Sequence, residues 1–287
     1  MWRIIEQAIS ESIGNTFEIQ DKKSVTGGDI NIAFQVFDNR LSFFVKLNDK
    51  DCLENFEQEC YALQQIEQLS PLSVPQPIAV GITLDKSYLV LNFQHFSNHD
   101  HWQKLGADLA TMHLSCTHGE YGWQNDNFIG TTLQPNPWQK NWAMFFAEQR
   151  IGWQLQLLAE KSIYLGDIDH ISEHIHQLLL HHHPRPSLLH GDLWQGNIGF
   201  TETECFVFDP ASYYGDRECD IAMTELFGQF PEQFYHGYKS QFPLAKGYEE
   251  RKHIYNFYHI LNHANLFGGV YIDQSKAMLQ RLLSTMA

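Results

Sequence analysis

The spacing of apolar residues predicts a helix followed by a β-hairpin at the start of the chain. Apolar residues recur every three or four positions from Trp2 to Ile13, so that they share one helical face. Residues 31–37 and 41–47 are strand-like segments on either side of a polar turn, which indicates an antiparallel pair. Alternate residues from Leu41 to Leu47 lie on one face of the second strand. Lys46 is therefore expected to project from the other face.

Farther along the chain, the pattern changes from strands to helices. Residues 53–68 have helical spacing, and 78–84 with 88–93 form a second predicted hairpin. Beyond about residue 95 the helical patterns span roughly 99–115, 137–161, 166–182, 218–229 and 250–267, interrupted by short apolar segments at 188–189 and 205–208. This order predicts an α+β protein with two lobes. The N-terminal lobe, 1–94, would be an antiparallel sheet with a helix, and the C-terminal lobe, 95–287, would be mostly helical.

Composition and charge make some kinds of binding partner improbable, in particular nucleic acids and membranes. The 287 residues carry 34 acidic and 19 basic side chains, a formal net charge of -15. Nucleic acids and anionic membrane surfaces usually meet a basic face, so we expect neither as a partner. The five scattered cysteines form no CxxC pair, and the N-terminus resembles no signal peptide. No segment has the length and apolarity of a membrane span, and we therefore expect a soluble, cytoplasmic protein.

The stretch His190-Gly-Asp-Leu-Trp-Gln-Gly-Asn197, followed by Asp209, carries the clearest chemistry. Phosphoryl transfer needs a carboxylate near the attacking hydroxyl and oxygen ligands that hold magnesium against the phosphates. The order Asp, four residues, Asn and then a second Asp is that of a kinase catalytic loop. It predicts that Asp192 orients or deprotonates the acceptor and that Asn197 and Asp209 bind Mg²⁺. The alternative is that these residues only cap a loop and a turn.

The same pattern requires parts upstream. A kinase places a lysine on its third strand, held by a helix glutamate and directed at the ATP phosphates. Lys46 has the strand position, with a solvated strand lysine as the alternative. Glu59 is our choice of partner, although Glu54 and Glu57 lie on the same predicted helix and spacing alone does not separate them.

Two further features concern the phosphates and the catalytic loop. The pair Gly27-Gly28 allows a tight turn whose backbone could approach a phosphate, although a plain hairpin turn fits equally well. No GxxxxGK[ST] motif exists, which excludes a P-loop kinase. Asp220, at the start of a helix, is expected to accept backbone N–H bonds and to support the loop together with His190. The short span from Asp209 to this helix favours a small-molecule acceptor over a protein-kinase activation segment.

At these residues the sequence resembles the fructosamine kinase family, within the aminoglycoside phosphotransferase and protein-kinase-like group. The matching segments are 189–199, 209–223, 121–130, 141–150, 27–31 and 56–59, so the resemblance covers roughly 24–270. It implies ATP- and Mg²⁺-dependent phosphorylation of the 3-hydroxyl of a ketoamine, a ribulosamine or fructosamine, followed by release of the amine. The acceptor would be a small-molecule or protein-linked ketoamine. The oligomeric state stays open.

Several positions leave alternatives open. Gln195 stands where the family usually has a small residue, and Asn92, expected near the adenine, stands where an acidic residue is common. Trp194 is either one wall of the acceptor pocket or a core residue beneath the loop. His259 and His263 lack a third ligand at a definite spacing, so we do not predict a metal site there. Other functions with this fold are phosphorylation of an aminoglycoside, choline or homoserine, or nucleotide binding without turnover.

Overall fold

The computed structural model describes residues 1–25, 31–116 and 118–284, and the chain divides into two compact units. Unit 1 comprises Met1–His101 and Gly196–Pro210, and unit 2 comprises Trp102–Gln195 and Ala211–Ala287. The sequence placed the division at 94/95 and assigned the segment Gly196–Pro210 to the second lobe. In the structure this segment clusters with the first part of the chain. Gly27 and Gly28 lie outside the described residues.

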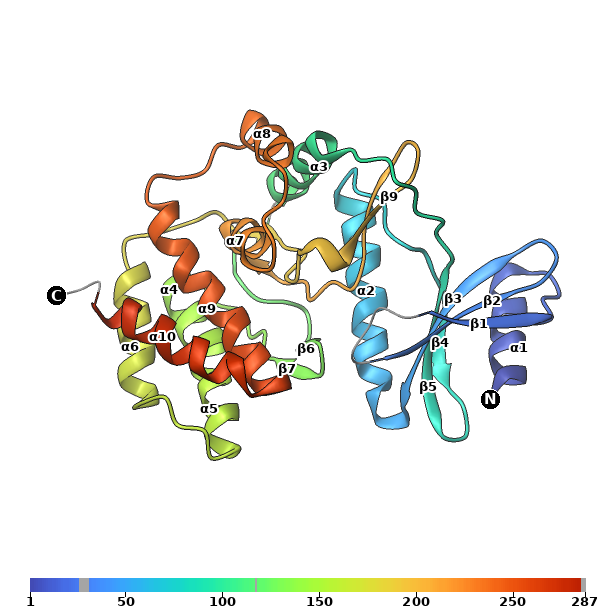
Figure 1. The fold of residues 1–287 in the computed structure, drawn as a ribbon, viewed down its shortest axis with the longest axis horizontal. Coiled ribbons are helices and arrows are strands. Elements are labelled where there is room, and N and C mark those ends of the chain that lie inside the picture. Colours follow the sequence, from blue (N-terminus) through green and yellow to red (C-terminus); the bar gives the residue numbers. More distant parts are fainter. Residues whose placement is uncertain (26–30, 117, 285–287) are drawn as a thin grey trace. The chain divides into compact units, whose positions relative to one another are not determined.

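Unit 1 is built on a five-stranded antiparallel sheet in the order β1-β2-β3-β5-β4 (Figure 1). The strands are β1 (Asp21–Val25), β2 (Ile32–Phe37), β3 (Ser42–Asp49), β4 (Pro77–Ile82) and β5 (Lys86–Asn92). A separate hairpin of β9 (Ile198–Phe200) and β10 (Cys205–Val207) completes the strands of this unit. Both hairpins expected from the alternation of apolar and polar residues are therefore present, at nearly the expected bounds.

Two helices flank the sheet of unit 1. Ile5 and Ile9 of α1 (Trp2–Ile13) pack on Phe43, Val45 and Leu47 of β3, which all belong to one buried cluster. Alternating strand residues face opposite sides, so Lys46 projects away from α1. On that other side lies α2 (Leu53–Leu69), as the contact between Lys46 and Glu59 shows. Figure 1 shows α1 and α2 on opposite faces of the sheet.

Unit 2 is mostly helical. Its helices are α3 (Trp102–Ser115), α4 (Trp142–Phe146), a π-helical turn (Ala147–Gly152), α5 (Trp153–Glu160), α6 (Ile168–Leu179), α7 (Glu218–Leu226), α8 (Glu232–Gln241), α9 (Tyr248–Phe267) and α10 (Val270–Ser284). Two short antiparallel pairs join β6 (Asn127–Ile129) to β7 (Thr132–Gln134) and β8 (Ser187–Leu188) to β11 (Tyr214–Gly215). Together the two units give the expected α+β class.

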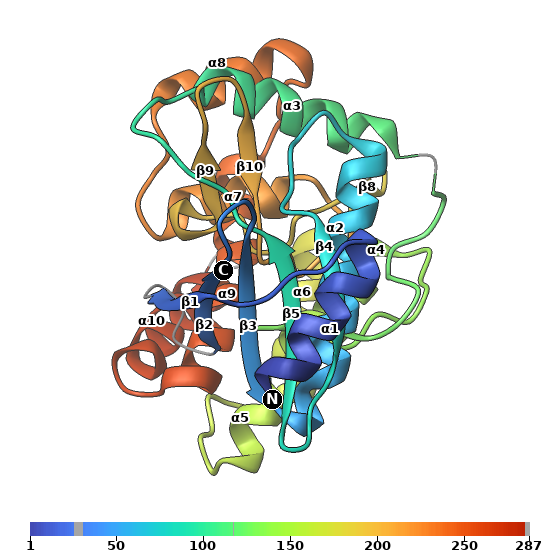
Figure 2. The ribbon, with the colours of Figure 1, turned by 90° about the vertical axis from the view of Figure 1, so that its right-hand side faces the viewer.

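The main differences from the predicted elements lie in unit 2. The helix expected over 137–161 starts only at Trp142, because Asn141 caps it by accepting the Met144 N–H at 3.1 Å. The helices α8 and α10 were not predicted. Helix α8 lies beside α3 in Figures 1 and 2, and the backbones come so close that a Cβ on Gly106 would meet the Phe234 carbonyl at 2.0 Å. Helix α8 buries Phe234, Tyr235 and Tyr238, but at ten residues it is shorter than the window in which helical spacing is read.

Two further observations concern the chain as a whole. Every cysteine is a free thiol. Among the described helices, none combines the length and the apolar character needed to cross a membrane.

Candidate active site

In unit 1 the buried cation Lys46 lies between two carboxylates. Lys46 is 5% exposed, and its Nζ lies 2.7 Å from Glu59 Oε1 and also contacts Asp209. Helix α2 therefore supplies Glu59 to this ion pair, which decides between it and its neighbours Glu54 and Glu57. Burial alone would lower the pKa of Lys46, but the carboxylates of Asp209 and Glu59 outweigh it and raise the pKa above its usual value. Lys46 is thus a fixed positive charge.

The two carboxylates differ in exposure. Glu59 has a side chain that is 13% exposed, and burial raises the pKa of Glu59 to about 6 despite the opposing attraction of Lys46. The side chain of Asp209 is 47% exposed, so this carboxylate can also reach a partner outside the protein. Asp209 has a φ of 55°, the left-handed conformation that few residues other than glycine adopt. Backbone conformations of this sparsely populated kind are found most often at active sites and ligand-binding sites.

The β9–β10 hairpin brings Asn197 and Asp209 together. Ile198 pairs with Val207, and the Phe208 N–H donates to the Asn197 carbonyl at 3.0 Å. Asn197 precedes the first strand and Asp209 follows the second, so both lie at the open end of the hairpin. An amide oxygen and a carboxylate at one place are the hard oxygen ligands that Mg²⁺ prefers. The residues present therefore fit a magnesium ion.

The nucleotide contact expected from the Asn92 side chain finds no support. Asn92 pairs with Phe43 on the sheet face that packs against α1, and its Oδ1 accepts the Gln76 N–H at 2.7 Å. Lys46 projects from the other face. Any contact at this position would have to come from the backbone.

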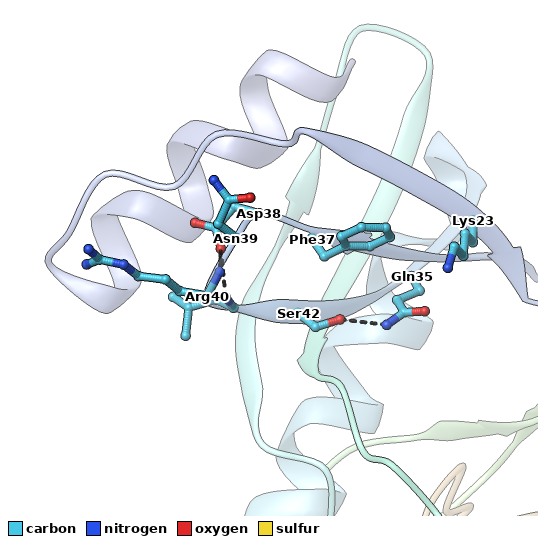
Figure 3. A pocket seen from close by; sticks show the side chains of 8 residues that line it. Lys23, Gln35, Phe37, Asp38, Asn39, Arg40 and Ser42 are labelled. Atoms are coloured by element: carbon cyan, nitrogen blue, oxygen red, sulfur yellow. Dashed lines mark hydrogen bonds between the residues drawn. The ribbon is translucent and has the colours of Figure 1, made fainter.

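A hollow of about 260 Å³ lies at the end of the β2–β3 hairpin (Figure 3). Gln35 and Ser42 line it and are joined by a hydrogen bond of 2.8 Å. Because Gln35 pairs with Phe44, two residues before Lys46, Gln35 and Lys46 share one face of the sheet. The Phe93 N–H donates to the Ser42 carbonyl at 3.2 Å, which links the hollow to the residue after Asn92.

In unit 2, Asp220 holds the backbone of the loop that carries Asp192. This carboxylate is 1% exposed and accepts the N–H groups of His190 at 2.7 Å and of Gly191 at 2.8 Å. His113 Nε2 lies 3.1 Å from the same carboxylate. Burial alone would raise the pKa of Asp220, but the hydrogen bonds from His113 and the loop lower it below its usual range. The sequence predicted the role of Asp220 but gave no sign of His113, which lies on a buried helix face.

The loop also depends on its glycine and on the short β8–β11 ladder. Gly191 has a φ of 84°, and a Cβ there would meet the Ala211 carbonyl at 2.0 Å. The Ala211 N–H donates to the His190 carbonyl at 2.9 Å. Because His190 follows β8 and Ala211 precedes β11, this contact lies just beyond the end of the β8–β11 ladder. His190 is fully buried, and its Nδ1 accepts the Asp192 N–H at 3.3 Å. These contacts fix the backbone position from which the Asp192 side chain projects.

Trp194 follows the loop and is 37% exposed. A residue with that exposure is not a core tryptophan, which removes one of the two alternatives that the sequence left open. Its indole can contact a ligand that reaches this part of unit 2.

The histidines that the sequence singled out are engaged in contacts within the protein. His263 Nδ1 lies 2.9 Å from the His259 carbonyl within α9. Elsewhere in the described residues, His182, Asp216 and Glu218 bring possible ligand atoms within 4.8 Å of one another. However, Asp216 already contacts His182 at 2.7 Å, and Glu218 accepts two hydrogen bonds from Arg251 at 2.7 and 2.9 Å. The cluster is an internal ion network.

The fold and these residues define a phosphotransferase of the protein-kinase-like class. At 16% identity, a choline kinase of Streptococcus pneumoniae shows the same fold, with a TM-score of 0.68 over 99% of both chains. The family model for fructosamine kinase matches residues 1–285, and this chain belongs to that family.

Relatives and solved structures agree with this assignment. A "probable ketoamine kinase" of Vibrio parahaemolyticus is 47% identical over 99% of this chain and 100% of its own length. A protein of the same description from Escherichia coli K12 is 42% identical with the same coverage. A crystal structure from Haemophilus somnus 129PT, assigned as a fructosamine-3-kinase, has a TM-score of 0.94 at 35% identity and covers 99% of this chain and 98% of its own.

Proposed function

We propose that this protein uses ATP and Mg²⁺ to phosphorylate the 3-hydroxyl of a ketoamine, a ribulosamine or fructosamine, and so initiates deglycation. One observation supports the kinase chemistry most directly. The buried Lys46 contacts Glu59 and Asp209, which lie 13 and 163 residues away in the chain. Burying a charge is costly unless it is paired, and the two carboxylates compensate the buried charge of Lys46. Membership in the fructosamine kinase family supports the choice of acceptor.

In this proposal unit 1 holds the nucleotide. Lys46 is the cation for the ATP phosphates, and Glu59 keeps its Nζ in place. The base end of the nucleotide would lie toward the hollow at Gln35 and Ser42, since these residues share the sheet face of Lys46. When bound by Asn197 and Asp209, Mg²⁺ neutralises negative charge on the phosphates.

In unit 2, Asp192 acts on the acceptor. Its carboxylate accepts the proton of the 3-hydroxyl as that oxygen bonds to the γ-phosphorus, and the bond from this phosphorus to the β-phosphate oxygen breaks to release ADP. Trp194 would form one wall for the sugar. Phosphorylation at C3, next to the C2 carbonyl, converts a poor leaving group into a good one. Loss of phosphate then leads to release of the amine.

A coupled ADP-release assay tests the proposal. We expect turnover that requires Mg²⁺ and a ribulosamine or fructosamine, and no turnover with choline, homoserine or an aminoglycoside. Asp192→Ala is expected to abolish transfer while ATP binding stays within twofold of the wild type. Asp169→Ala, a surface carboxylate of α6, is the matched control and is expected to change neither. Turnover only with one of the other alcohols would refute the choice of acceptor.

We also propose that the protein is located in the cytoplasm. It is supported by the free thiol state of all five cysteines.

A further inference from the structure

Unit 2 contains a second pocket that the phosphoryl-transfer chemistry does not use. It has a volume of about 460 Å³ and is formed by the two segments that flank the β6–β7 hairpin, with Trp123 to Asp126 before β6 and Pro135 to Trp138 after β7. The hairpin itself is labelled in Figure 1. Gln149 closes the pocket from the π-helical turn. The size suits a group of several non-hydrogen atoms rather than a single ion.

The floor of the pocket is rigid and polar. Asn136 is 2% exposed, and its Nδ2 donates to Asn127 Oδ1 at 2.8 Å, while its Oδ1 accepts from Arg150 at 2.6 Å. At the rim, the Asp126 carboxylate accepts the Asn136 N–H at 2.7 Å. Arg150 is fully buried and lies 4.0 Å from the centre of the Tyr213 ring, so its charge stays below the floor. The charge that the pocket itself presents is that of Asp126.

The aromatic side of the pocket is also held in place. Trp138 is 38% exposed and stacks on His118 with a ring separation of 4.3 Å and an angle of 15°. Trp123 is 2% exposed and packs against Tyr214 at 5.2 Å. A partly exposed indole that is stacked on one side is a preformed platform for an apolar or amide plane. Because Trp138 is already ordered, little entropy is lost when a ligand packs on it.

The lining indicates the charge of the ligand. Around Trp138 it offers the side-chain amides of Gln124, Asn125 and Gln149 and the carboxylate of Asp126, and no lysine or arginine belongs to the described lining. Amides pair well with other amides and hydroxyls, whereas an anion would meet Asp126 without a cation to compensate it. The pocket therefore suits an uncharged or cationic polar group.

The pocket is connected to the catalytic loop within the same unit. Gln134, the last residue of β7, donates to the Ala211 carbonyl at 3.1 Å, and the Ala211 N–H donates to the His190 carbonyl at 2.9 Å. On the aromatic side, Tyr214 pairs with Leu188 of β8, two residues before His190. Two short chains of contacts thus join the pocket walls to the loop that carries Asp192.

We propose that this pocket binds the amine-bearing part of the acceptor, namely the peptide groups around a glycated lysine. The inference rests on the function proposed above, in which the sugar lies at Asp192. Neutral peptide amides match the amide lining and pack on Trp138, whereas an amine that ends in a carboxylate and carries no ammonium beside it would be repelled by Asp126. The pocket thus favours an amine that continues into peptide groups over one that ends in a carboxylate.

The test uses two ketoamines that differ only in the amine. One is the ribulose adduct of Nα-acetyl-lysine methylamide on its side-chain nitrogen. The other is the adduct of butylamine, which reproduces the lysine side chain without peptide groups. Trp138→Ala is expected to raise KM for the first adduct about tenfold, to leave KM for the second within twofold and to leave kcat unchanged for both. Tyr164→Ala, an aromatic residue that is 72% exposed and does not line the pocket, is the control and is expected to change neither.

A second variant tests the charge. Asp126→Asn keeps an oxygen for the Asn136 N–H but removes the negative charge, so KM for the adduct of 6-aminohexanoate, which has a carboxylate and no α-ammonium, is expected to fall severalfold while KM for the methylamide stays within twofold. Equal KM changes for both amines in Trp138→Ala, or no change in either variant, would overturn the inference and leave the proposed function standing. A wild-type protein inactive on every ketoamine would overturn the proposed function itself, and the inference with it.

Discussion

Replacing Asp220 by asparagine removes the charge that holds the catalytic loop. In the wild type, both carboxylate oxygens accept backbone N–H groups, from His190 at 2.7 Å and from Gly191 at 2.8 Å. Asparagine retains one acceptor oxygen, but its NH₂ group would face the other N–H donor. One buried donor is then left unsatisfied, and the contact with His113 weakens as well.

The size of the effect follows from burial. Breaking a fully buried, hydrogen-bonded charge network costs about 3–5 kcal/mol. For a protein of this size such a loss lowers the melting temperature by roughly 10 °C. Because the loop carries Asp192, a displacement of about 1 Å is expected to reduce kcat by about 100-fold, with KM for ATP nearly unchanged.

Differential scanning calorimetry and the ADP-release assay at 15 °C measure the two effects separately. Asp108→Asn is the matched control, because Asp108 pairs with Lys104 one turn away on the surface of α3. Loss of such a helix pair costs only about 0.3–0.5 kcal/mol. If Asp220→Asn melts within 2 °C of this control and keeps the wild-type kcat, the assignment of Asp220 as the support of the loop is wrong.

Three further substitutions test other parts of the structure. Lys46→Met is expected to reduce kcat at least 100-fold, because the fixed cation is lost, and a fluorescent ATP analogue titrated into the variant shows whether binding survives. Gly191→Ala places a Cβ 2.0 Å from the Ala211 carbonyl at a φ of 84° and is expected to lower both the melting temperature and kcat, whereas an active, stable variant would contradict the described loop. Burial lowers the pKa of His259 from 6.5 to about 3, so the unfolded chain takes up a proton that the folded protein does not. This stability is fully present above pH 6.5 and is lost as the pH falls toward 3, with about 2 kcal/mol gone at pH 5, and His259→Gln is expected to flatten the fall in melting temperature between pH 7 and pH 5.

The parts of the fold that follow a simple period could be predicted from the sequence. The alternation around Lys46 predicted which face of β3 it would occupy, and the helical spacing over 53–68 predicted α2 within one residue. The same patterns placed Glu59 on that helix but did not separate it from Glu54 and Glu57. That choice depends on the rotation of α2 over the sheet, which is a tertiary property.

Other features had no local signal. Helix α8 packs on α3 with a close backbone contact at Gly106, and its ten residues are too few for their helical spacing to stand out in the sequence. The pocket beside the β6–β7 hairpin depends on Arg150 reaching back to Asn136 across 14 residues, and a buried arginine looks like any other arginine in a sequence. Asn92 was expected near the adenine from its place in the segment that was expected to link the lobes, but as the last residue of β5 it has its side chain on the face opposite Lys46.

Each unit has its own buried charge, Asp220 in unit 2 and Lys46 in unit 1, and the order of the proposed functional residues along the chain gives a reason for this. Asp192 and Asp220 belong to unit 2, whereas Asn197 and Asp209, which lie between them in sequence, belong to unit 1. The chain therefore leaves unit 2 after Gln195 and returns at Ala211, so Asp192, the proposed base, and Asn197, the proposed magnesium ligand, are only five residues apart. The residues at each end of this connection are held by contacts within their own unit. Asp220 anchors the loop before the crossing, and the contact of Lys46 with Asp209 anchors the end of the hairpin before the return. Asp220 and Lys46 are both buried charges, in surroundings where hydrogen bonds are strong and the cost of leaving them unmade is high.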